Sequence, residues 1–71
     1  MLMRIKIQGG FEFEVEVFTK CAHGEIKYVA ELQDQVISFF DSRVEYSGKT
    51  IEDCVSAIAV ALDDAVAKAQ E

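Results

Sequence analysis

The residues of this chain that could do chemistry are few, and their spacing argues against a catalytic centre. Cys21 and His23 lie close together in an expected loop, where a thiol nucleophile rarely aligns with an imidazole base and no third group orients the pair. Zinc would need a further Cys or His pair, but Cys54 falls on the apolar stripe of an expected helix. We therefore predict no catalytic residue, no metal site and two free thiols, with Cys54 buried.

Acidic neighbours and the glycine pair are equally poor candidates for a catalytic or cofactor site. Glu52 with Asp53, and Asp63 with Asp64, are adjacent on an expected helix, so their side chains point about 100° apart. The glycines at positions 9 and 10 join two expected strands and precede no helix N-terminus, so they are not a phosphate loop. We predict no cofactor and no enzymatic activity.

A ladder of glutamates gives the best functional signal. Apolar residues alternate with Glu12, Glu14 and Glu16 between Phe11 and Val17, which predicts a strand with an apolar side and an acidic side. The 71 residues include 13 acidic and 7 basic ones, for a net charge of −6. This balance disfavours nucleic acid or anionic lipid as a direct ligand and favours a basic protein surface.

The elements that would position this ladder begin with a hairpin. An alternating run from Met3 to Ile7 precedes the ladder, and a loop of residues 8–10 would keep the apolar sides of both strands together. The predicted pairs are Ile7 with Phe11, Ile5 with Phe13, Met3 with Val15, Lys6 with Glu12 and Arg4 with Glu14. This register neutralises part of the ladder and leaves Glu16 without a basic partner.

Two further strands are expected. After a turn over residues 19–24, a strand from Ile26 to Leu32 would direct its even-numbered residues to the core, and residues 33–35 would form a turn. A fourth strand, from Val36 to about Tyr46, carries bulky apolar residues on both faces. Either a bulge near residues 39–40 switches its faces, or a partner or second subunit covers the other face of the sheet.

A helix is expected after residues 47–49 end the sheet. Thr50 and Asp53 resemble a capping box, and helical periodicity follows. Val60 falls on the polar side, either as an ordinary exposed residue or as part of a seam for a second helix. The apolar stripe comprises Ile51, Cys54, Val55, Ile58, Ala59, Leu62, Ala65, Val66 and Ala69.

The predicted fold is α+β: a four-stranded, mostly antiparallel sheet (ββββα) with one C-terminal amphipathic helix on one face, forming a single domain over residues 1–71. The uncovered face would carry Arg4, Lys6, Glu12, Glu14, Glu16, Lys27 and Glu31. A chain this small favours oligomerisation or a bound partner. It shows no apolar run of membrane-spanning length and no signal peptide, so a cytoplasmic location is expected.

Two segments, 28–34 (YVAELQD) and 47–55 (SGKTIEDCV), resemble the strand and helix-start segments of HicB-type antitoxins. The resemblance covers less than half of the chain. It implies a small sheet-plus-helix domain that binds and neutralises a small basic RNA-cleaving toxin, commonly as an oligomer.

Two functional hypotheses follow. In the first, the chain sequesters a basic, nucleic-acid-processing protein, as antitoxins and phage-encoded anti-defence or anti-CRISPR inhibitors do, through an acidic surface that mimics nucleic acid. The candidate partner-binding residues are Glu12, Glu14, Glu16 and Glu31 on the sheet, or Glu52, Asp53, Asp63 and Asp64 on the helix. In the second, the chain is an assembly subunit that self-associates, for example as a homodimer, through Phe39, Phe40 and Val60.

Overall fold

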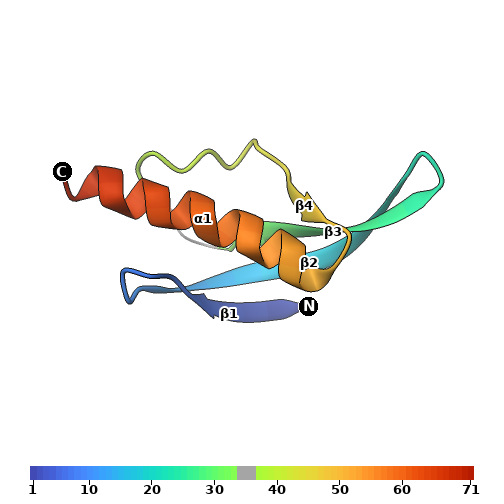
Figure 1. The fold of residues 1–71 in the computed structure, drawn as a ribbon, viewed down its shortest axis with the longest axis horizontal. Helices are drawn as coiled ribbons and strands as arrows, with labels where there is room; N and C mark the ends of the chain where they lie inside the picture. The colour runs from blue at the N-terminus through green and yellow to red at the C-terminus, as the bar shows by residue number, and fades with distance from the viewer. Residues whose placement is uncertain (34–36) are drawn as a thin grey trace.

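The computed structural model describes residues 1–33 and 37–71 and confirms the predicted α+β fold. Its antiparallel sheet has the strand order β1-β2-β3-β4, and the C-terminal helix α1 packs across one face (Figure 1). The elements are β1 (Leu2–Lys6), β2 (Glu12–Ala22), β3 (Glu25–Leu32), β4 (Tyr46–Gly48) and α1 (Ile51–Ala69).

The β1–β2 hairpin has the predicted register. Met3, Arg4, Ile5 and Lys6 pair with Val15, Glu14, Phe13 and Glu12, and the Ile7 amide donates to the Phe11 carbonyl at 3.0 Å. Gly10 takes a positive φ of 86° in the turn, a conformation that suits glycine. The core position predicted for Phe11 is wrong. Its side chain is 45% exposed because it lies at the turn, against Gly9, rather than beneath α1.

The core lies between the sheet and α1. Phe13, Val15 and Val17 of β2 pack against Ile58 and Leu62, and the latter two are fully buried. Burying side chains of this size contributes about 1.5–3 kcal/mol each. The predicted helix stripe is confirmed in its middle, whereas Ala69 at the end of α1 is exposed.

The start of α1 depends on Thr50 and Gly48. Thr50 is the N-cap residue, as predicted, and its hydroxyl accepts a hydrogen bond from the Asp53 amide at 3.1 Å. A Cβ atom at Gly48 would lie 2.3 Å from the Asp53 Cβ and 2.9 Å from the Cys54 nitrogen. Glycine at this position therefore allows β4 to pass directly beneath the first turn of α1.

The prediction of a long fourth strand is wrong. β4 spans Tyr46–Gly48, and residues 37–45 form turns and bends, with Phe39 at a positive φ of 69°. The closely spaced bulky residues of this segment cannot satisfy a two-residue alternation, and Phe40 instead stacks on Tyr46 with ring centroids 5.5 Å apart. Positions 34–36, which include two residues of the predicted 33–35 turn and the start of that strand, lie outside the described residues.

The β2–β3 hairpin runs past the N-terminal end of α1 (Figure 1). Its turn is tighter than predicted, because β2 continues to Ala22 and β3 begins at Glu25. The predicted core position of Ile26 is therefore wrong: the residue is 68% exposed because α1 does not reach this end of the sheet. The projection lengthens the molecule to 43 Å against 20 and 19 Å in the other directions.

Candidate functional site

The side of the sheet opposite α1, here called the open face, carries most of the charged strand residues. Strand alternation places the even-numbered residues of β2 and the odd-numbered residues of β3 on this face. The cross-strand pairs there are Glu16 with Glu31, Phe18 with Val29 and Lys20 with Lys27. Along the two strands, an acidic row is thus followed by an apolar row and then by a basic row.

Glu16 and Glu31 form a like-charged pair directly across the two strands. Such a pair destabilises a sheet unless a positive charge lies nearby. The N-terminal amine lies 3.3 Å from Glu16, whereas within the described residues Glu31 has no ion pair. The Glu31 carboxylate is therefore available to a cation from outside the chain.

Arg4 neutralises part of the remaining ladder, as predicted. Its guanidinium Nη2 lies 3.5 Å from Glu14 Oε1, and its Nε lies 4.0 Å from Glu12 Oε2. Both pairs are well exposed, and pairs of this kind contribute about 0–1 kcal/mol. The sheet therefore holds these two carboxylates only weakly.

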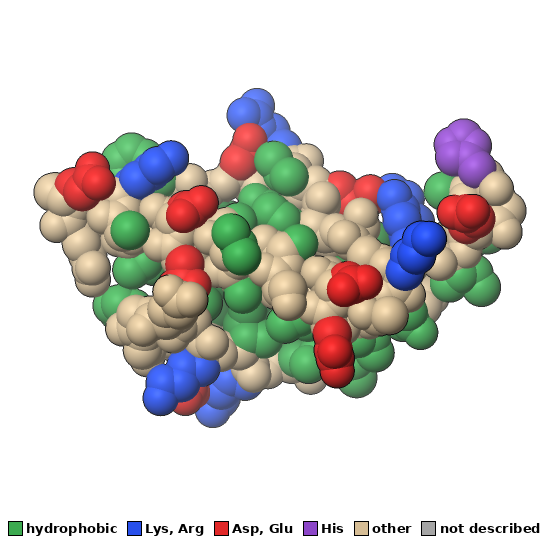
Figure 2. All heavy atoms as spheres, viewed as in Figure 1, with side chains coloured by type: hydrophobic (Ala, Val, Ile, Leu, Met, Phe, Trp, Pro, Cys, Tyr) green, Lys and Arg blue, Asp and Glu red, His purple; other side chains and the backbone are tan. Residues whose placement is uncertain are grey.

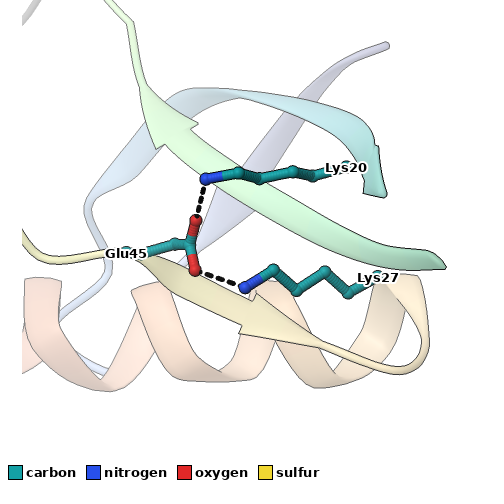
Figure 3. Close-up of polar contacts among 3 residues, drawn as sticks. All are labelled: Lys20, Lys27 and Glu45. Carbon is teal, nitrogen blue, oxygen red and sulfur yellow. Dashed lines mark hydrogen bonds and ion pairs between the residues drawn. The ribbon is translucent and has the colours of Figure 1, made fainter. Parts of the chain in front are cut away.

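Glu45 joins the two lysines of the basic row (Figure 3). Its Oε1 accepts a hydrogen bond from Lys20 Nζ at 2.8 Å, and its Oε2 accepts one from Lys27 Nζ at 2.6 Å. These hydrogen bonds lower the pKa of Glu45 to about 2, and in return the carboxylate raises the pKa of Lys20. We call Lys20, Lys27 and Glu45 the lysine clamp.

The clamp also covers the apolar row. Tyr46 pairs with Ala30, so Glu45 lies near the level of Glu31, and Lys20 of β2 must cross β3 near Val29 to reach it, beside Phe18 in the lining of the same hollow. Lysine stems readily cover apolar surface while the ammonium group stays in water. This explains why Val29 is only 3% exposed on a face that α1 does not cover.

A hollow of about 620 Å³ opens beside the apolar row, between β3 and residues 40–46. β4 pairs with Tyr28, Val29 and Ala30, so within the described residues the sheet register gives Glu31 and Leu32 no strand neighbour on that edge. The hollow is lined by apolar side chains that include Phe18, Leu32 and Phe40, with Glu31 and Glu45 among its polar residues.

The predicted acidic residues of α1 lie on the other side of the molecule from the ladder. Glu52, Asp53 and Asp64 are exposed, whereas Asp63 accepts a hydrogen bond from the Gln8 amide at 3.0 Å and so ties α1 to the β1–β2 turn. On the face that Figure 2 shows, acidic and basic side chains are interspersed. The eight candidate residues therefore form two separate surfaces, one on the open face and one on α1.

The residues proposed for self-association come from two different parts of the chain. Phe39 is 68% exposed in the segment before β4, and Val60 is 62% exposed on α1. Phe40 is half-buried and packs against Tyr46 and the core.

The two cysteines are free, as predicted. Cys21 is exposed, and Cys54 is fully buried, which raises the pKa of its thiol. Across residues 1–33 and 37–71, no three His, Cys, Asp or Glu side chains gather as metal ligands. Within the same ranges, no helix is long and apolar enough to cross a membrane.

Sequence reasoning missed the lysine clamp and the hollow. Lys20 fell in a predicted turn and Glu45 in a predicted strand, so their meeting could not be foreseen. The one available signal was the pair of apolar residues, Phe18 and Val29, at polar positions of otherwise alternating strands. No protein-family model matches this chain, and no curated protein or solved structure matches it.

Proposed function

We propose that this protein is an acidic inhibitor that docks its open face onto a basic, nucleic-acid-processing protein and blocks that protein's active surface. Antitoxins and phage-encoded anti-defence proteins act in this way. The observation that supports the proposal best is the Glu16–Glu31 pair, because two like charges directly opposite each other become favourable when a partner supplies a cation. Glu12 and Glu14 extend the negative surface along β2.

The geometry of the ladder suits a surface that competes with nucleic acid. Alternate residues of a strand lie about 6.6–6.8 Å apart, so Glu12, Glu14 and Glu16 present evenly spaced negative charges. The net charge of −6 adds long-range attraction toward a basic partner. Binding should therefore be fast at low salt and weaken as the ionic strength rises.

Affinity capture from the native host lysate tests the proposal. The protein is immobilised, washed at low salt and eluted at high salt, and the eluted protein is purified and identified. We expect a basic protein that elutes with salt, rebinds in a one-to-one complex and loses its nuclease or nucleic-acid-binding activity in that complex. Capture of a partner whose activity is unchanged in the complex would contradict the inhibitor function.

A charge-matched pair of variants then locates the binding surface. Glu14→Gln with Glu16→Gln removes two charges from the ladder, and Asp64→Asn with Glu71→Gln removes two from exposed positions on and after α1, away from the open face. We expect about tenfold weaker partner binding, near 1.4 kcal/mol, for the first double variant and little change for the second. Equal weakening by both would indicate an effect of net charge alone and would exclude the open face as the binding site.

Self-association is the second candidate function, and the exposed ring of Phe39 favours it. Sedimentation of the purified chain at several concentrations tests it. A stable oligomer that Phe39→Ser dissociates, together with recovery of only the protein itself from the lysate, would replace the inhibitor proposal.

A further inference from the structure

The hollow beside β3 has the size of a binding groove. Its volume of about 620 Å³ lies within the range of 300–1,000 Å³ that is typical of ligand sites. It adjoins the edge of β3 just beyond the first residue of β4, where the chain enters the sheet after Glu45. A strand added at this edge would continue the line of β4 for a few residues.

The charges around the hollow favour a basic occupant. Arg43 lies 3.2 Å from Asp41, and Lys20 is held by Glu45. Glu31 is the lining carboxylate that has no ion pair within the described residues, and it faces Glu16 across the sheet. An incoming cation at this point would therefore meet two carboxylates.

The two sides of the edge differ in chemistry. Glu31 points to the open face, whereas Leu32, the next residue, points to the other side and packs with Phe40 against the core. Successive residues of an added strand also point to opposite faces. Beside Glu31 such a strand would present one side chain to a carboxylate, and beside Leu32 its neighbour would meet an apolar wall.

We propose that the hollow binds an extended segment of the partner protein, in which one lysine or arginine meets Glu31 and the adjacent bulky apolar side chain inserts between Leu32 and Phe40. The basic character of the partner rests on the proposed function. The apolar anchor is a separate requirement, because charge alone does not fill the hollow. The partner is thus recognised by alternating basic and apolar residues in a β-conformation.

Short peptides test this inference directly. The probe is an acetylated and amidated hexapeptide of alternating arginine and leucine, titrated into the ¹⁵N-labelled protein and followed by amide chemical shifts. Two controls replace the arginines by glutamate or the leucines by serine. We expect shifts centred on Leu32 and Tyr46 with a Kd of about 1 mM or tighter for the probe alone. Equal binding of the serine peptide would overturn the apolar anchor, and no binding of the probe would overturn the groove.

A steric variant tests the contribution of the hollow to binding independently of the charges on the open face. Ser42 lines the hollow and is exposed, so Ser42→Phe fills the hollow without changing any charge. Ser38→Phe makes the same change at an exposed position of the same segment that does not line the hollow. We expect Ser42→Phe to weaken peptide binding at least fivefold and Ser38→Phe to leave it unchanged. Equal behaviour of the two variants would refute the groove.

The two proposals fail in different ways. If a captured partner depends on Glu14 and Glu16 but is indifferent to Ser42→Phe, the open face binds the partner and the groove inference is wrong. If the peptide binds in the hollow but the lysate yields no basic partner that the protein inhibits, the groove stands and the inhibitor function is wrong.

Discussion

Two like-charged pairs face each other across β2 and β3, and the chain completes only one of them with a side chain of its own. Lys20 and Lys27 share the carboxylate of Glu45, with both contacts at hydrogen-bonding distance. Glu16 and Glu31 lie on the same face beyond the apolar row, and within the described residues no lysine or arginine lies within ion-pair distance of either.

The difference separates a carboxylate that stabilises the fold, Glu45, from one that is available for binding, Glu31. Glu45 anchors the segment before β4 to the hairpin, so its carboxylate is occupied by the fold itself. Glu31 contributes nothing comparable to the fold and faces a negative neighbour, which makes it the better candidate for binding. An acidic residue is thus informative about function only after its contacts within the chain are known.

Disrupting the close approach between β4 and α1 should produce the largest loss of stability. Gly48→Val places side-chain atoms where Asp53 and Cys54 already lie, so β4 must move away from α1 and carry Glu45 away from the lysines. Overpacking of this kind costs about 1–3 kcal/mol or more. Urea denaturation measures the loss, with Ser47→Ala as the neighbouring control; an unchanged midpoint for Gly48→Val would show that the close approach is not required.

Removing the clamp carboxylate should have a smaller effect that depends on salt. Glu45→Gln leaves Lys20 and Lys27 opposite each other without a counterion, so stability falls, and added salt should recover part of the loss by screening the repulsion. A double-mutant cycle with Lys27→Gln checks the mechanism, because the second change should cost less when Glu45 is already absent. Additive effects would contradict the clamp.

Relieving the acidic pair should change stability in the opposite direction. Glu31→Gln removes the repulsion with Glu16, and we expect a gain of about 0.2–1 kcal/mol in unfolding free energy. The same variant should bind the Arg–Leu peptide more weakly. A loss of stability together with unchanged peptide binding would show that Glu31 serves the fold.

The pH dependence of the clamp should be the smallest effect. The folded pKa of Glu45, about 2, lies below its ordinary value of 4.5, so the carboxylate stabilises the fold above pH 4.5 and loses this contribution as the pH falls toward 2. Melting temperatures of the native chain and Glu45→Gln should therefore converge as the pH falls through this window. A constant difference between the two would argue against titration of Glu45.

The sequence was sufficient to predict the fold, because local patterns determine most of it. The register of the first hairpin followed from matching both faces of two alternating strands, and the helix stripe followed from its periodicity. The prediction of a long fourth strand was wrong because it followed the high β-propensity around Phe39 and Phe40. In the structure, tertiary packing outweighs that propensity, and Phe40 stacks on Tyr46.

The candidate site was predicted in part. The acidic ladder and its pairing with Arg4 follow from register alone. The clamp and the hollow depend instead on where residues 40–46 return to the sheet, a contact distant in sequence that no local pattern encodes. Phe18 and Val29 violated the polar alternation of their strands, and this violation marked the place where the lysines provide cover.

The unbroken strand order has a consequence for the kinetics of folding. Each strand pairs with its neighbour in sequence, so the first two pairings close short turns and cost little chain entropy. The β1–β2 turn meets the helix much later in the chain, as the hydrogen bond from the Gln8 amide to Asp63 shows. We expect the antiparallel strand pairings to form early and reversibly. Docking of the C-terminal helix should then set the rate at which the native state appears.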